Sequence, residues 1–270
     1  MIMIKNCTRI FTGLLFTGLL FFSMQSFGQL SGYYTIGGTG ANYATFTAAV
    51  NALSTYGVSG PVTFTVAAGT YNEQISISSI TGASATNTIT FDGVDKNTRI
   101  LTYSASSTAN MATVTFNACS YVTFKNLTIN STGSSYALGV YFAPYSTYNK
   151  VTNCNIVVPQ ISSTYVGAVR ASGAQSSYSS ACAGLKYNEV SYNYISGGDF
   201  TVVFYGNQYS GSYDNIGNKF NYNTVDWAYY YKLYWYYQGT YEVIGNKFTK
   251  AYGAGYGYPT YIYYCSEGKV

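Results

Sequence analysis

Residues 187–195 read Tyr-Asn-Glu-Val-Ser-Tyr-Asn-Tyr-Ile, and the frame in their second half returns four more times along the chain. The frame is an apolar residue, two mostly polar residues, Asn193, one further residue and an apolar β-former. Successive frames start 27, 39, 30 and 23 residues apart, which is the range of one structural repeat. The position of Asn193 is taken in the other frames by Leu127, Cys154, Asn223 and Asn246.

A repeated short strand that carries Asn at a fixed place predicts a solenoid. One turn of chain cannot bury its apolar side chains alone, so turns stack and line a continuous interior. Asn tolerates left-handed backbone angles and suits a corner between strands, where stacked Asn side chains can bond to one another. The alternative is an antiparallel sandwich with Asn in its hairpin turns, but hairpin dipeptides are scarce, with Asp92-Gly93 the sole Asp-Gly.

The first 28 residues have the pattern of a secretory signal peptide. A basic start with Lys5 and Arg9 precedes an apolar run, and Ser26 and Gly28 place small residues before Gln29. We therefore expect a signal peptide at 1–28, a single domain at 29–270, and a secreted or cell-surface location. No later segment is long and apolar enough to predict a membrane span.

Composition excludes several classes of function. Charged residues make up only 8% of the chain and the net charge is +4, which does not favour nucleic-acid binding. There is no His, which removes imidazole bases and the usual zinc sites. We expect no cofactor and no metal. The cysteines at 119, 154, 182 and 265 lack metal-ligand spacing. For Cys154, which lies inside a repeat frame, we favour a buried free thiol over a disulfide.

Only one stretch has a convincing helical pattern. Phe46, Ala49, Val50 and Leu53 share one helical face within residues 45–56, and Gly57 follows as a stop signal. One short helix before many strands is well placed to cover the open end of a stack. Strand patterns follow at residues 62–66, 75–77, 89–91, 100–101, 114–116 and 122–124.

Three segments carry a resemblance to a known superfamily. Residues 66–75, 89–93 and 121–129 resemble the opening coils of the right-handed parallel β-helix superfamily, in particular its pectin-methylesterase-like and pectate-lyase-like members. With the leader and the Tyr, Thr, Ser and Gly bias, the first 160 residues also resemble β-helix modules of secreted Bacteroidota surface proteins. The resemblance implies an all-β fold, a right-handed parallel β-helix with one short N-terminal capping helix. It does not by itself imply an activity.

The catalytic groups that the resemblance implies do not carry over. Pectin methylesterases use two carboxylates with Gln and Arg side chains. The segment expected to carry the first Gln, residues 131–140, has none, and the next offers Gln160 without a carboxylate. Asp92 and Asp95 lie in a Gly-containing turn beside Lys96, which favours a solvated loop. We therefore lean against an enzyme and assign no catalytic residue.

Stacked coils could still bring distant acids together. Asp199 and Asp226 each follow a repeat frame, although at different offsets, and form a weak candidate pair. An outer face with three close carboxylates, or carboxylates beside Arg99 or Arg170, would favour a polysaccharide lyase, a pectin esterase or a glycoside hydrolase. An outer face of tyrosine rows without such a cluster would favour a binding scaffold.

Tyrosine is the most unusual feature of the composition. Of 33 Tyr, 19 lie between residues 192 and 264. Alternate strand residues face outward, so the densest run would place rings on the exterior, where they could contact sugars. The alternative is that Tyr merely covers exterior sheet faces as a good β-former. The candidate ligand-binding residues are Tyr229, Tyr231, Tyr234, Trp235, Tyr236 and Tyr237.

The sequence thus predicts an exported, non-catalytic β-helix, a surface or adhesin-like scaffold whose partner is an extracellular polysaccharide or cell-surface glycan. A carbohydrate-active enzyme is the alternative. After Phe248 no second capping helix is evident, so either the domain is truncated there or its last coils are irregular.

Overall fold

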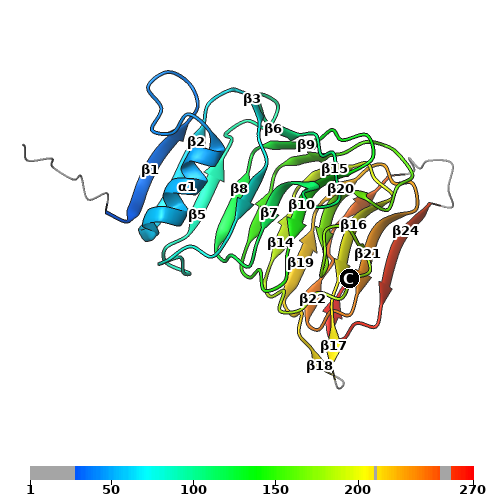
Figure 1. Ribbon diagram of the computed structural model, residues 1–270. Coiled ribbons are helices and arrows are strands. Elements are labelled where there is room, and N and C mark those ends of the chain that lie inside the picture. The colour runs from blue at the N-terminus through cyan, green and yellow to red at the C-terminus, as the bar shows by residue number, and fades with distance from the viewer. Residues whose placement is uncertain (1–27, 210–211, 250–256) are drawn as a thin grey trace, which may run out of the picture.

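The computed structural model describes residues 28–209, 212–249 and 257–270, so the expected signal peptide lies outside the described residues except for Gly28. The described chain winds into a solenoid of three sheets in which every neighbouring pair of strands is parallel (Figure 1). This arrangement confirms the predicted parallel β-helix and rules out the two-sheet sandwich. A small antiparallel hairpin of β17 (Gln208–Tyr209) and β18 (Ser212–Tyr213) projects from one turn.

We name the three sheets A, B and C. Sheet A contains β1 (Leu30–Ile36), β2 (Val58–Val66), β5 (Ile89–Asp92), β8 (Val122–Lys125), β11 (Lys150–Thr152), β14 (Glu189–Ser191), β19 (Asn218–Asn221), β22 (Tyr241–Glu242) and β25 (Gly268–Lys269). Sheet B contains β3 (Gly69–Asn72), β6 (Arg99–Tyr103), β9 (Thr128–Ser131), β12 (Asn155–Val157), β15 (Tyr194–Ser196), β20 (Thr224–Val225) and β23 (Lys247–Phe248). Sheet C contains β4 (Ile75–Ile77), β7 (Ala112–Phe116), β10 (Ala137–Phe142), β13 (Val166–Ala171), β16 (Phe200–Tyr205), β21 (Tyr231–Tyr236) and β24 (Tyr258–Tyr263).

The predicted helix is α1 (Phe46–Tyr56), and it lies at the N-terminal end of the stack. Thr45 caps it by accepting a hydrogen bond from the Ala48 amide at 3.0 Å. The Glu73 carboxylate accepts two more from the first-turn amides of Phe46 and Thr47, which satisfies orphan donors and complements the helix dipole. Among the described residues, no helix combines the length and apolarity needed to cross a membrane.

Apolar side chains from successive turns fill the interior in continuous stacks. Phe64, Phe91 and Phe124 lie one above another in sheet A, with ring centroids 5.0 and 4.7 Å apart. The cysteines at 119, 154, 182 and 265 are free thiols and the first three are buried, which confirms the prediction made for Cys154. Burial raises the pKa of Cys154 to about 12, so it remains a neutral, apolar element of the interior.

The repeated frame is the corner between sheets A and B, and its Asn residues form a ladder. Asn193 Nδ2 donates to Asn223 Oδ1 at 3.0 Å, and Asn223 Nδ2 donates to Asn246 Oδ1 at 3.1 Å. At the other end, the Cys154 amide donates to Asn193 Oδ1 at 2.8 Å. Leu127 is buried at the equivalent corner of the preceding turn. The predicted bonding between stacked side chains is therefore confirmed.

The expected reason for Asn at this corner was wrong. The left-handed residue is the one before each ladder position: Asn126, Asn153, Tyr192, Tyr222 and Gly245, all with φ between 50° and 65°. The ladder residue itself points inward. Asn is needed there because its amide can bond both to the next Asn and to a backbone carbonyl in the buried corner.

A second ladder, not foreseen from the sequence, starts the strands of sheet A. Asn149 Nδ2 donates to Asn188 Oδ1 and Asn188 Nδ2 to Asn218 Oδ1, each at 3.2 Å, with all three residues buried. Left-handed Tyr148 and Tyr187 precede the first two. The Tyr-Asn dipeptides at 148–149, 187–188, 192–193 and 222–223 were the available signal, because each is a left-handed corner followed by a ladder Asn.

Candidate functional site

The tyrosine-rich strands lie at the C-terminal end of sheet C and place most of their rings on its outer side. Neighbouring strands are in register, so Tyr205, Tyr236 and Tyr263 form one row along the solenoid. Val203, Tyr234 and Tyr261 form a second row, and Phe200, Tyr231 and Tyr258 a third. We call the following set the tyrosine face: Tyr205, Tyr231, Tyr234, Tyr236, Tyr258, Tyr261 and Tyr263.

The rings of this face stand on edge. Tyr234 and Tyr261 are parallel within 5° with centroids 5.0 Å apart, and Tyr205 and Tyr236 are parallel within 11° at 4.9 Å. Parallel rings this close cannot lie side by side in one plane, so they stack face against face. Neighbouring rings therefore cover much of each other's faces, and the surface presents ring edges and hydroxyls. Among the described residues, β24 is the terminal strand of sheet C at this end, and no further strand of that sheet covers its rings.

The sequence misplaced one candidate ligand residue. Trp235 points into the coil, is fully buried, and packs on Phe204 with a centroid distance of 4.3 Å. It lies between the outward residues Tyr234 and Tyr236 and cannot contribute to the tyrosine face, since alternate strand residues point to opposite sides. Tyr237 follows β21 at a left-handed corner and stacks on Tyr264 at 5.4 Å. Tyr229 is partly buried ahead of β21.

Two phenols of the tyrosine face, those of Tyr231 and Tyr234, have raised pKa values. Burial, followed by the nearby phenols of Tyr205 and Tyr261, raises the pKa of Tyr234 to about 12. The pKa of Tyr231 is also raised, chiefly by burial. The hydroxyls of Tyr231 and Tyr234 therefore keep their protons at ordinary pH and can both donate and accept a hydrogen bond.

The middle of sheet C is covered by residues 172–183, which we call the strap. Gln175 anchors the strap: its Oε1 accepts from the Met111 amide at 2.7 Å and its Nε2 donates to the Ala109 carbonyl at 2.9 Å. Tyr178 lies flat on Phe200, with ring centroids 3.9 Å apart. The strap thus ends where the tyrosine face begins, and it closes off the outer side of β13.

Arg170 of β13 is completely buried under the strap. Its Nη1 donates to the Gln175 carbonyl and its Nη2 to the Thr164 carbonyl, both at 2.7 Å. Burial lowers the pKa of Arg170 to about 10, and burial also raises the pKa of Asp199 despite the attraction of Arg170. Burial thus outweighs the electrostatic attraction between the two groups, and Arg170 Nε and Asp199 Oδ1 have no hydrogen-bond partner. The pair is closed to a polymer and has no second carboxylate.

Asp199 and Asp226, the weak candidate pair from the sequence, have separate partners. Asp226 accepts hydrogen bonds from the hydroxyls of Tyr194 at 2.9 Å and Thr249 at 2.7 Å. The Thr249 bond is the main reason that the pKa of Asp226 is lowered, whereas Asp199 is held near Arg170. The pKa of Asp199 is raised and the pKa of Asp226 is lowered, each by its own neighbours. The two carboxyl groups therefore do not form a catalytic dyad.

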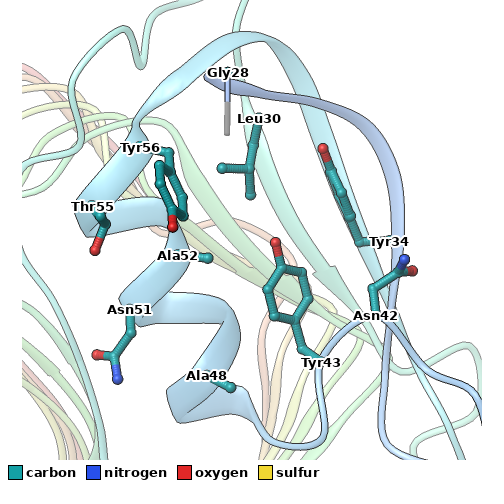
Figure 2. Close-up of a pocket in the computed structure, with 10 residues that line it drawn as sticks. All are labelled: Gly28, Leu30, Tyr34, Asn42, Tyr43, Ala48, Asn51, Ala52, Thr55 and Tyr56. Carbon is teal, nitrogen blue, oxygen red and sulfur yellow. The ribbon is translucent and has the colours of Figure 1, made fainter. Parts of the chain in front are cut away.

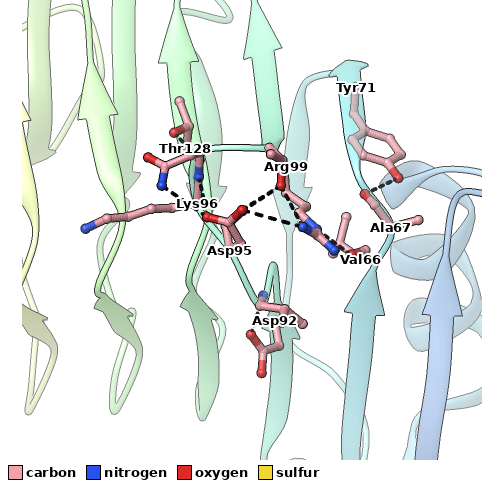
Figure 3. Close-up of polar contacts among 11 residues, drawn as sticks. Val66, Ala67, Tyr71, Asp92, Asp95, Lys96, Arg99 and Thr128 are labelled. Atoms are coloured by element: carbon pink, nitrogen blue, oxygen red, sulfur yellow. Dashed lines mark hydrogen bonds and ion pairs between the residues drawn. The ribbon is translucent and has the colours of Figure 1, made fainter.

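Asp95 lies in the turn between β5 and β6, beside Arg99 (Figure 3). Asp95 Oδ2 lies 3.8 Å from Arg99 Nη1 and accepts from the Thr98 hydroxyl at 2.9 Å. Asp92 points away from Asp95 and pairs with Lys125 at 3.0 Å. These contacts support the predicted solvated loop. Over the described ranges, no three Cys, Asp or Glu side chains gather in a way that could hold a metal ion.

Comparisons with known proteins show likeness in structure. No protein-family model matches the sequence, and no curated protein matches it. A pectin methylesterase solved in complex with a hexasaccharide is 14% identical over 85% of this chain and 72% of its own, with a TM-score of 0.54. The rice weevil pectin methylesterase is 15% identical over 87% of this chain and 72% of its own, with a TM-score of 0.54. The pectin methylesterase of Erwinia chrysanthemi is 15% identical over 84% of this chain and 71% of its own, with a TM-score of 0.51. The chain therefore has the parallel β-helix fold that is also seen in pectin methylesterases.

Proposed function

We propose that this protein is an exported β-helix scaffold that binds an extended polysaccharide on the tyrosine face and does not cleave it. The observation that carries the proposal is the set of in-register tyrosines on the outer side of β16, β21 and β24. Surface display, and the origin among Bacteroidota surface proteins that the sequence resembles, are part of the same proposal.

The geometry of the rings indicates how a glycan would be held. Rows of phenol hydroxyls repeat about every 5 Å along the solenoid, because neighbouring strands in a sheet are roughly 4.7–4.9 Å apart. A pyranose unit in an extended chain advances by a comparable distance, so successive sugars could meet equivalent hydroxyls. The faces of Tyr258, Tyr261 and Tyr263 at the end of the stacks offer a platform for a sugar ring.

A retention and turnover screen tests the proposal. The purified protein is incubated with insoluble and soluble polysaccharides, and bound protein and released products are both measured. Binding without product supports the proposal, and a Tyr234→Ser/Tyr261→Ser double variant is expected to lose most of it. Tyr33→Ser is the matched control, since Tyr33 is 86% exposed on β1 at the far end of the solenoid. Retention unaffected by the double variant would contradict the assignment of the face.

The alternative, a carbohydrate-active enzyme, rests on Arg170 and Asp199 beneath the strap. It requires the strap to leave the sheet, which would break the Gln175 bonds to Met111 and Ala109. Release of methanol, uronate or reducing ends from any polysaccharide, abolished by Arg170→Lys, would establish that activity and overturn the non-catalytic proposal.

A further inference from the structure

A second candidate site lies at the opposite end of the solenoid, between α1, β1 and the loop that joins them (Figure 2). The cavity has a volume of about 520 Å³, within the roughly 300–1,000 Å³ usual for small-molecule sites. The rings of Tyr34, Tyr43 and Tyr56 surround it, and Leu30 closes one end. Ala48 and Ala52 contribute only methyl groups from the helix, which is what leaves the space open.

The walls of this cavity are held in place by contacts of their own. The Tyr43 amide donates to the Thr35 carbonyl at 3.0 Å, and the Gly37 amide donates to the Tyr43 carbonyl at 2.9 Å. Asn42 Oδ1 accepts from the amide and hydroxyl of Thr35 at 2.9 and 3.0 Å. Tyr43 also packs edge-on against Phe64 with a centroid distance of 5.6 Å. A cavity whose walls are already ordered loses little conformational freedom on binding.

The chemistry of the lining is neutral and mixed. None of the ten lining residues has a charged side chain, so no side chain there offers a counter-ion to a carboxylate, a phosphate or an amine. Burial raises the pKa of Tyr43, and the neighbouring phenols of Tyr34 and Tyr56 raise it further. The ring centroids of Tyr34 and Tyr43 lie 5.8 Å apart, and both side chains are partly buried. Flat aromatic walls with hydroxyl and amide groups match a ligand that has an apolar ring face and a rim of hydroxyls.

We propose that this cavity binds one or two units of a neutral pyranose sugar. The inference does not depend on the tyrosine face, because α1 and β24 lie at opposite ends of the solenoid. A neutral sugar places its C–H face against a tyrosine ring and its hydroxyls toward the phenols and the Asn42 amide. An acidic sugar would bring an uncompensated charge into a partly dehydrated site and is expected to bind more weakly.

The test uses glucose, galactose, mannose, cellobiose and galacturonate, with binding followed by saturation-transfer NMR. Ala52 points into the space between Tyr43 and Tyr56, so Ala52→Phe fills the cavity. Ser54→Phe adds the same ring at an exposed position of the same helix that does not line the cavity. We expect Ala52→Phe to weaken binding of at least one neutral sugar by roughly tenfold or more, about 1.4 kcal/mol, while Ser54→Phe leaves it within twofold.

Several outcomes would overturn the inference. They are no transfer from any of the four neutral sugars, equal binding by Ala52→Phe and the wild type, or binding of galacturonate in preference to the neutral sugars. Circular dichroism checks that both variants are folded. The Tyr234→Ser/Tyr261→Ser variant separates the two proposals: it retains cavity binding here, and loss of the sugar signal in that variant alone would place the binding on the tyrosine face.

Discussion

Cutting the first asparagine ladder at its centre should be among the most damaging single changes in this protein. Asn223 Oδ1 accepts from the backbone amide and the Nδ2 of Asn193, both at 3.0 Å. Its Nδ2 donates to the Val190 carbonyl at 2.9 Å and to Asn246 Oδ1 at 3.1 Å. Asn223→Ala removes all four bonds in a buried corner. The two backbone groups that lose a bond are the Asn193 amide and the Val190 carbonyl. Each buried polar group left without a partner costs about 1–3 kcal/mol, so the two together give roughly 2–6 kcal/mol.

That loss is a large part of the roughly 5–15 kcal/mol by which a domain is usually stable. It can be measured by urea denaturation followed through fluorescence of the buried Trp235, which lies on β21 in the same turn as Asn223. Native-state hydrogen exchange adds a local measure, because the Asn193 amide loses its acceptor and should exchange much faster. Asn72→Ala is the control, since Asn72 is exposed on β3. A change below about 1 kcal/mol with unaltered exchange at Asn193 would refute the reasoning that the ladder stabilises the stack.

Four further predictions follow from the same contacts. Cys154→Asn should extend the ladder by one rung, because Cys154 Sγ already points at the Phe124 carbonyl at 3.7 Å, and raise the unfolding free energy by about 1 kcal/mol; a lower stability in urea would show that the corner cannot hold the amide. Gly217→Ala should destabilise by about 1–3 kcal/mol, because Gly217 has φ +68° and an added Cβ would lie 2.3 Å from the Tyr187 ring; normal thermal melting would contradict this. The stability should fall from about pH 9 toward 12, since thiols ionise near pH 9 and phenols near pH 10 in the unfolded chain, whereas Cys154 and Tyr234 in the folded protein have a pKa of about 12; a rise over that interval, measured by urea titration, would reverse the sign. Gln175→Ala should loosen the strap and speed its cleavage by a protease without changing glycan retention, and equal cleavage rates would show that Gln175 does not anchor it.

Much of the fold could be predicted because its signals are local. The frame at Val190 to Ile195 contains the end of β14, the corner and the start of β15, so one short pattern specifies the passage from sheet A to sheet B. Alternation in the segment that became β2, and the one apolar face of α1, likewise lie within single elements. These patterns predict the structure correctly because each one reflects which side chains of a single element face the interior.

The candidate sites were harder to predict because they depend on contacts between distant residues. The sequence placed Tyr234 on the outside but could not show that Tyr261 covers its face. The strap is rich in Ser and Ala and has no recognisable motif. Its position is fixed by the hydrogen bond between Gln175 and Met111, which are 64 residues apart in the sequence. Trp235 was misplaced because a run of aromatic residues hides the strand alternation. The cavity beside α1 depends on β1 pairing with β2 across the helix, which no local pattern records.

The second ladder has a consequence for how a gene of this kind can change in length. Asn188 and Asn218 occupy equivalent points one turn apart, and each follows a left-handed residue. Excising the codons for 188–217 would join Tyr187 to Asn218 and leave the remaining coils in phase. Unequal recombination can therefore shorten or lengthen such a protein by complete turns. The length of the solenoid then changes in steps of one strand spacing.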